Sequence, residues 1–367
     1  MLSKNRNYGL DLLRMLSMFL IVNLHVLGQG GAMVRVTGRE AVYYSCWFVE
    51  TCAYCAVDCY GLISGYVGVE SKHRPARILE LWLQVLFYSA GITLLFRILA
   101  PELLTEGSLW NAIFPVGWKT YWYFSAYVGL FFVMPYLNRL VNALTERELK
   151  KLALVLFFLF SGATALPKVN GSDFLQLAGG YSFIWLAVLY LLGACIRKCH
   201  FRRWEKWKYL LAYFEMAAFS WIFKIGMENY TRKVYGEAKF GRLFTSYTAP
   251  TILLCAVCLL LIFETLEIKS ERVKKWIAYL SPLAFSVYLI HTHPLVFGNV
   301  LKGVFSGYRS LPAPLAVLAV LVTAVLIYIA CTLVDIVRRK LFELGKVRSK
   351  CEKVVRLMEK RFHQSVR

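Results

Sequence analysis

The first apolar segment of the chain carries three side chains that could do chemistry inside a membrane. Asp11, Arg14 and His25 interrupt an otherwise apolar stretch from Gly9 to Gly28. Ionisable groups in a membrane-spanning helix are costly, so they usually face a protein interior or cavity and mark function. At about 100° per residue, Arg14 and His25 share one helix face, about 16 Å apart. Asp11 precedes Arg14 by one turn on nearly the same face. The alternative, a charged helix end plus one packed histidine, does not explain why His25 shares this face, so a functional role is favoured.

Further polar side chains fall at comparable depths in later apolar segments. Glu50 and Asp58 interrupt the second segment. His291 lies in the outer half of the ninth segment, at a depth similar to that of His25 in the first segment. A lone His291 would be explained by packing, but two histidines at one depth favour a shared cavity. Trp122 and Tyr123 open the fourth segment, where interfacial aromatic residues are the ordinary interpretation.

The composition indicates the class of protein that positions these side chains. The chain has 367 residues, 58% of them hydrophobic, and a mean hydropathy of +0.53. These values predict an all-α, polytopic integral membrane bundle, since spanning helices need about 20 apolar residues each. About ten spans are expected, at residues 9–28, 45–69, 77–99, 121–138, 152–167, 180–196, 208–226, 246–264, 276–297 and 313–336.

The net charge of +21 follows the topology rather than a nucleic-acid partner. With ten spans, most lysines and arginines fall on the segments that share a side with both termini. Because basic residues concentrate in cytoplasmic loops, both termini are expected in the cytoplasm, with the chain in the cell membrane and in contact with its lipids. No nucleic-acid partner is expected, and nothing in the sequence indicates an oligomeric state.

Two domains are expected, a membrane domain over residues 1–337 and a basic cytoplasmic tail over residues 338–367. Apolar residues recur at helical spacing in the tail, which is typical of an amphipathic helix on an anionic membrane surface, although a plain solvated tail is an equal alternative. Residues 227–245 are expected to form an outer loop, basic and rich in tyrosine, suited to an anionic or carbohydrate acceptor or simply solvated.

The ten cysteines do not predict a metal site. Cys255 and Cys258 have the spacing of a ligand pair, but zinc needs four ligands and no matching pair stands at a suitable distance in the sequence. The cysteines are expected to be packing residues, and no metal is expected.

Four segments together resemble the integral-membrane acyltransferase 3 family. They resemble, in order, its R-x10-H, F-F-x-x-S-G-[FY], W-[FY]-[FL]-x-x-L and S-x-x-[YF]-L-x-H motifs. The matching residues are Leu10 to Arg14 with His25, Val57 to Tyr66, Tyr121 to Phe124 with Tyr127 and Pro135, and Ser286 to His291. Cys59 and Tyr60 replace two phenylalanines, and Tyr123 stands where phenylalanine is commonest. The resemblance covers essentially the whole chain.

The resemblance implies a membrane-bound O-acyltransferase of the stand-alone type, which moves an acyl group, by default acetyl, from acyl-CoA to a glycan or lipid-linked sugar. His25 is then the essential histidine, as a base or as a transiently acylated group, and Arg14 binds coenzyme A or orients the thioester. His291 would assist as acid or base or bind the acceptor. The other expected binding residues are Asp11, Glu50, Asp58, Ser64, Trp122, Tyr123, Ser286 and Tyr288.

A transporter or flippase is the competing interpretation. Intramembrane charges and histidines also serve proton relays and substrate paths, but such proteins are often built from paired inverted halves with broken helices. No such halves are visible in the sequence. A binding or scaffold protein would leave the stripe from Arg14 to His25 unexplained. Consumption of acetyl-CoA separates the enzyme from the transporter.

Overall fold

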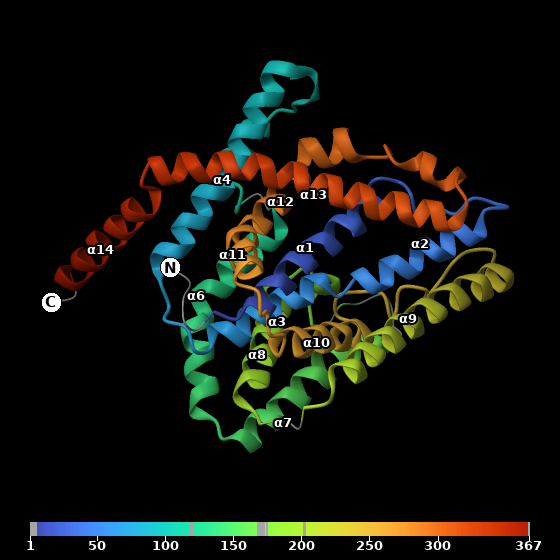
Figure 1. Ribbon diagram of the computed structural model, residues 1–367, viewed down its shortest axis with the longest axis horizontal. Coiled ribbons are helices and arrows are strands. Elements are labelled where there is room, and N and C mark those ends of the chain that lie inside the picture. Colours follow the sequence, from blue (N-terminus) through green and yellow to red (C-terminus); the bar gives the residue numbers. More distant parts are fainter. Residues whose placement is uncertain (1–5, 118–119, 167–172, 174, 201–202, 366–367) are drawn as a thin grey trace.

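The computed structural model describes residues 6–117, 120–166, 173, 175–200 and 203–365, and this part of the chain is helical, with no strand. Helix α1 (Tyr8–Leu27) begins where the Asn7 side chain accepts a hydrogen bond from the Leu10 amide, 3.0 Å away. Its apolar residues are buried on most sides, and it runs through the middle of the helical body (Figure 1). The helices that pack against it are α2 (Glu40–Ala53), α3 (Ala56–Gly68), α10 (Pro250–Glu264), α11 (Glu271–Leu280), α12 (Ala284–His291) and α13 (Ala313–Leu344).

The second expected span is broken into two helices. α2 ends at Ala53 and α3 begins at Ala56, so Tyr54 and Cys55 lie at the junction. The remaining α-helices are α4 (Pro75–Leu99), α5 (Ser108–Ile113), α6 (Trp122–Ala143), α7 (Glu146–Leu156), α8 (Phe183–Lys198), α9 (Lys206–Tyr235) and α14 (Val347–Ser365).

The number of membrane spans is not confirmed as ten. Five described helices, α1, α4, α6, α9 and α13, are long and apolar enough to cross a membrane by themselves. A sixth span is possible over residues 271–310, where two helical parts meet at 72°. The other expected spans are short or broken: α8 has 16 residues and α10 has 15, below the roughly 20 that a straight span needs.

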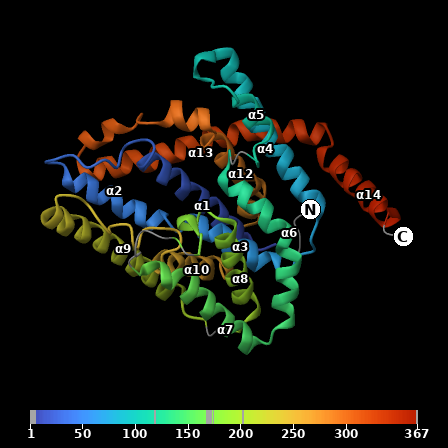
Figure 2. The same ribbon diagram turned by 180° about the vertical axis from the view of Figure 1, so that it is seen from behind.

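Two expected boundaries differ from the helices observed. α9 continues to Tyr235, so residues 227–235 are helical rather than part of a loop. α13 continues through the expected domain boundary to Leu344. Gly345 and Lys346, the latter with a φ of 48°, then separate it from α14. Figures 1 and 2 both show α14 projecting beyond the helical body, and its position on a membrane surface stays a prediction.

The closest helix crossing joins α3 to α8 through two glycines. A Cβ atom on Gly65 would lie 1.8 Å from the backbone oxygen of Tyr190, and one on Gly193 would lie 2.1 Å from that of Leu62. Since backbone atoms cannot be displaced as a flexible side chain can, both positions require glycine. The glycine of the Ser64-Gly65-Tyr66 segment is therefore a packing residue.

We expect Gly65→Ala to destabilise the protein by about 1–3 kcal/mol, because the added methyl group forces α3 and α8 apart. The matched control is Gly226→Ala in α9, where a Cβ meets no atom within 4 Å. That change should be neutral or stabilising by about 0.5–1 kcal/mol, since alanine favours helix. Thermal unfolding of both variants in detergent measures the difference. Equal melting temperatures would contradict the packing role.

Candidate functional site

The structure brings His25 and His291 into direct contact, although 266 positions separate them in the chain. Nδ1 of His25 lies 2.8 Å from Nε2 of His291, and the ring centroids are 5.0 Å apart. The contact forms because α1 packs against α12 and each histidine stands at or near the last turn of its helix. His291 is 1% exposed, whereas His25 is only partly buried. The proximity expected from their common depth is thus observed.

A backbone carbonyl assigns the protons of this pair. Nδ1 of His291 lies 2.5 Å from the backbone oxygen of Val287, which can only accept, so this nitrogen carries a hydrogen. With both rings neutral, as burial favours, Nε2 of His291 accepts and Nδ1–H of His25 donates. The lone pair of His25 therefore resides on Nε2, for which no hydrogen-bond partner is seen among the described residues. His25 therefore presents a basic, nucleophilic nitrogen and is held in one tautomer.

At the other end of α1, the predicted acid–arginine pair is present. Arg14 donates from Nη1 to Oδ1 of Asp11 at 2.6 Å, and Arg6 donates from Nε to Oδ2 at 2.5 Å. Ser281 adds a hydrogen bond to the same carboxylate at 3.3 Å. Asp11 is 5% exposed, whereas about a third of the side-chain surface of Arg6 and of Arg14 is exposed. Asp11 thus holds two cations at the edge of an accessible space.

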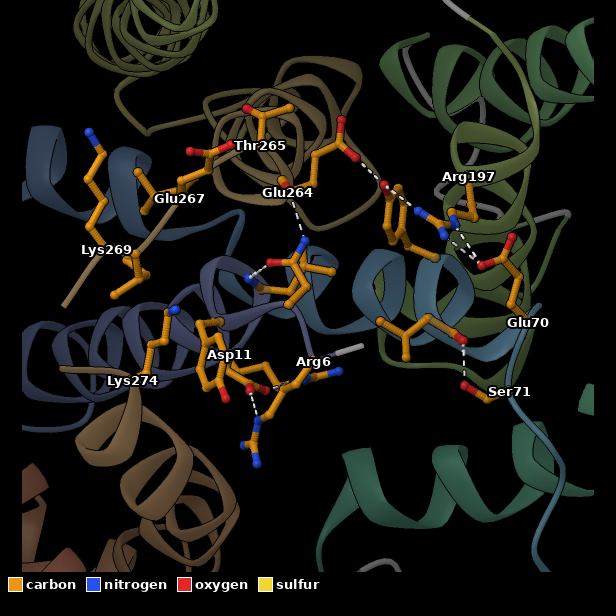
Figure 3. A pocket seen from close by; sticks show the side chains of 18 of the residues that line it. Arg6, Asp11, Glu70, Ser71, Arg197, Glu264, Thr265, Glu267, Lys269 and Lys274 are labelled. Carbon is orange, nitrogen blue, oxygen red and sulfur yellow. Dashed lines mark hydrogen bonds and ion pairs between the residues drawn. The ribbon is translucent and has the colours of Figure 1, made fainter. Parts of the chain in front are cut away.

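That space is an open cleft of about 1320 Å³, shown in Figure 3. It lies where the first turns of α1 meet the last turns of α3, α8 and α10. Basic and acidic side chains line it in equal number: Arg6, Arg14, Arg197, Lys269 and Lys274 against Asp11, Glu70, Glu264, Glu267 and Glu271.

Ion pairs organise the cleft wall away from α1. Arg197 donates to Glu70 from two nitrogens, at 2.6 and 2.9 Å, and these hydrogen bonds hold the pKa of the Glu70 carboxyl below its usual value. Lys274 donates to Glu271 at 2.6 Å. Tyr66 donates to the Glu264 carboxylate, tying the last turn of α3 to that of α10 (Figure 3). The cleft is therefore polar and preorganised.

The predicted aromatic residues form a chain of ring contacts that reaches α12, the helix that carries His291. The rings of Tyr123 and Tyr288 are 6.4 Å apart, and the Tyr288 hydroxyl accepts from the Tyr123 amide at 3.4 Å. Tyr288 stands one turn before His291 on α12. The Trp122 ring contacts that of Tyr123, with centroids 5.6 Å apart. The start of α6 is thereby connected to the site through α12.

The other predicted binding residues contact protein partners. Asp58 is fully buried and accepts from Nε1 of Trp185 at 3.0 Å. Ser64 donates to the backbone oxygen of Tyr60 within its own helix. Glu50 is 7% exposed, and its Oε2 has no hydrogen-bond partner among the described residues. The second carboxylate oxygen of Asp58, Oδ2, likewise has no hydrogen-bond partner among the described residues. A binding role for Glu50, Asp58 and Ser64 therefore stays a prediction.

Ser286 belongs to a buried polar network that the sequence analysis missed. It donates to Oδ1 of Asp335 at 2.5 Å and accepts from Gln84 at 2.6 Å. Tyr88 and Arg338 donate to the same Asp335 oxygen, each at 2.6 Å. Asp335 and Arg338 repeat the three-residue spacing of Asp11 and Arg14, and this spacing was the signal that could have revealed them. The network fixes α12, and with it His291, between α4 and α13.

Comparison with known proteins identifies the family to which the chain belongs. A family model described as an acyltransferase domain, that of the acyltransferase 3 family, matches residues 7–333. This range contains both histidines and almost the entire cleft wall. No match was found among curated proteins or among solved structures.

We expect Asp335→Asn to destabilise the protein by about 3–5 kcal/mol, because it leaves the buried Arg338 guanidinium without its counter-charge. The double variant D335N/R338M removes both charges and should recover part of that loss. Thermal unfolding in detergent compares the two variants. A double variant that is less stable than D335N would contradict the role of the ion pair.

Proposed function

Since the chain belongs to the acyltransferase 3 family, we propose that it transfers an acetyl group from acyl-CoA in the cytoplasm to a hydroxyl group of an extracytoplasmic or lipid-linked glycan. The resemblance seen in the four motifs is confirmed by the family match, and membrane acyl transfer follows from it. The acetyl donor, the glycan acceptor and a location in the bacterial plasma membrane with cytoplasmic termini are the parts that we propose.

The observation that carries the proposal is the His25–His291 contact with its assigned protons. Acyl transfer to an alcohol needs a base that removes the hydroxyl proton while the oxygen attacks the thioester carbonyl. Nε2 of His25 has the free lone pair for this step, and Nδ1–H holds the ring by donating to His291. His291 accepts that hydrogen bond and so stabilises the positive charge that His25 gains. The released thiolate takes up a proton, which balances the reaction.

The same lone pair would serve a route through acylated His25. In that route Nε2 attacks the thioester carbonyl, the thiolate leaves, and the acceptor hydroxyl then attacks the acyl group on the ring. Both routes require His25 in this tautomer. His291 is a positioning residue in either case.

The donor is expected to bind at the cleft. Arg14, Arg6, Lys269 and Lys274 offer charge-assisted hydrogen bonds to the phosphates of coenzyme A. Asp11 holds the two arginines by ion pairs, and Glu271 holds Lys274. The pantetheine arm would then follow the face of α1 from Arg14 to His25, about 16 Å along the helix. This arrangement brings a cytoplasmic thioester to a histidine near the opposite end of α1.

We expect His25→Ala to lower the release of free thiol from acetyl-CoA by about 10²- to 10⁴-fold, the range for losing a general base. Arg14→Ala should instead raise the KM for acetyl-CoA by roughly 10- to 100-fold, through loss of a charged hydrogen bond. His200→Ala is the matched control, since the His200 side chain is 92% exposed and bonds only to surface Glu146 among the described residues. Thiol release by purified protein in nanodiscs measures all three.

Full activity of His25→Ala would overturn the assignment of the base. Absence of thiol release and of acetyl-CoA binding in the wild type, together with saccharide flux across vesicles, would favour the transporter instead.

A second prediction tests the proton assignment. A glutamine at position 291 can accept from His25 through its carbonyl oxygen and donate to Val287 through its amide group. We therefore expect His291→Gln to retain at least tenfold more thiol release than His291→Leu, which can do neither. Equal rates in these two variants would show that His291 does not hold the tautomer of His25.

A further inference from the structure

Glu50 is a buried acid with an unused hydrogen-bonding oxygen. The side chain is 7% exposed, near the end of α2, and its Oε2 has no partner among the described residues. Burying a polar atom without a hydrogen bond costs free energy, so such an atom in a functional protein calls for a ligand or water to complete it. Thr245, in the loop before α10, has a second buried oxygen without a described partner.

The acid lies beside an aromatic cluster. Tyr54 stands one helical turn after Glu50, with helical backbone angles (φ −61°, ψ −28°). Tyr247 and Arg242 lie within electrostatic range of the carboxyl group. The Tyr247 ring contacts that of Tyr54 at a centroid distance of 5.1 Å and that of Tyr181 at 5.0 Å.

Trp122 extends the same cluster toward the histidines. Its ring contacts Tyr181 at 4.6 Å and lies nearly parallel to Tyr247 at 6.3 Å, with 21° between the planes. Tyr181 is 50% exposed, so the cluster reaches the surface. Four rings from four separate segments thus form one cluster, which includes the Tyr54 ring one turn after Glu50.

The cluster lies at the far ends of helices whose other ends form the cleft. Tyr181 lies two residues before Phe183, the first residue of α8, and Arg197 lies in its last turn, about 21 Å from Phe183 along the helix. Tyr247 precedes α10 in the same way, and Glu264 in the cleft ends that helix. A ligand at the aromatic cluster therefore approaches from the opposite side to a ligand in the cleft.

A chain of ring contacts joins the aromatic cluster to the helix that carries His291. Trp122 contacts Tyr123, Tyr123 contacts Tyr288, and Tyr288 stands one turn before His291 on α12. Each ring contact is within 6.4 Å between centroids. An acceptor held on the cluster would therefore lie against elements that also position His291.

We propose that this cluster binds a pyranose ring of the acceptor glycan, with Glu50 as the hydrogen-bond acceptor for its hydroxyl groups. The inference rests on the proposed function and names the side chains that select its acceptor: Glu50, Tyr54, Trp122, Tyr181, Arg242 and Tyr247.

The chemistry of the cluster favours a sugar over an acyl chain. A pyranose presents an apolar face of C–H groups that packs on aromatic rings, and a rim of hydroxyl groups that donate to a carboxylate. A hydrocarbon chain would use the rings but leave Glu50 unsatisfied, which is costly in a buried site. Arg242 supplies a donor for the ring oxygen or for hydroxyl oxygens at the exposed edge.

The test is equilibrium binding of two neutral trisaccharides, maltotriose and triacetylchitotriose, to the full-length protein in nanodiscs, followed by tryptophan fluorescence. We expect saturable quenching by at least one of them. Glu50→Gln should weaken its binding roughly tenfold or more, as loss of a hydrogen bond to a charged group implies. Tyr181→Ala should weaken it about three- to tenfold, the range for one aromatic contact.

Tyr230→Ala is the matched control, because Tyr230 is 59% exposed on α9 and lies outside the cluster. It should bind the trisaccharide like the wild type, and all variants should keep the wild-type affinity for acetyl-CoA. Absence of saturable quenching by both trisaccharides, or wild-type binding by Glu50→Gln and Tyr181→Ala, would overturn the inference. Trisaccharide binding that these variants weaken, in a protein that releases no thiol from acetyl-CoA, would uphold this site and refute the proposed function.

Discussion

The structure depends on one constraint, that an ionisable side chain inside the helical body is costly unless polar partners meet it. Asp11 draws Arg6, Arg14 and Ser281 to the start of α1. His25 near the end of α1 meets His291 of α12. Asp335 collects donors from α4, α12 and α13. Because an unpaired polar group is costly in a low-dielectric interior, these contacts fix how the helices are placed as well as how the site is charged.

The same contacts therefore build the candidate site at the two ends of α1. α1 supplies the pair of Asp11 and Arg14 at an open polar cleft and a histidine in a more enclosed region. Helices α8 and α10 run from the aromatic cluster to the cleft, so donor and acceptor would approach from opposite ends. Such a separation suits a reaction whose two substrates lie on different sides of a membrane, since neither needs to cross it whole.

Glycine packing and the broken span serve the same arrangement. Gly65 and Gly193 let α3 and α8 approach to backbone contact, which leaves no room for a side chain between them. The break at Tyr54 and Cys55 separates α2 from α3 and places the Tyr54 ring beside Tyr247. The backbone of Tyr54 is still helical (φ −61°, ψ −28°), so its ring stands one turn after Glu50 and contacts Tyr247 from there.

The sequence by itself determined the family, the helical class and the shared face of Asp11, Arg14 and His25, because the 3.6-residue period is a local property that needs no partner. It did not determine the number of spans, since length and hydropathy cannot tell a straight span from two short helices. Only the tertiary structure decided that His25 meets His291, which of their nitrogens carry hydrogen, and that Tyr181 and Tyr247 join Trp122 beside Glu50. These contacts join residues distant in the chain, and they follow from how whole helices pack, which no local pattern of residues encodes.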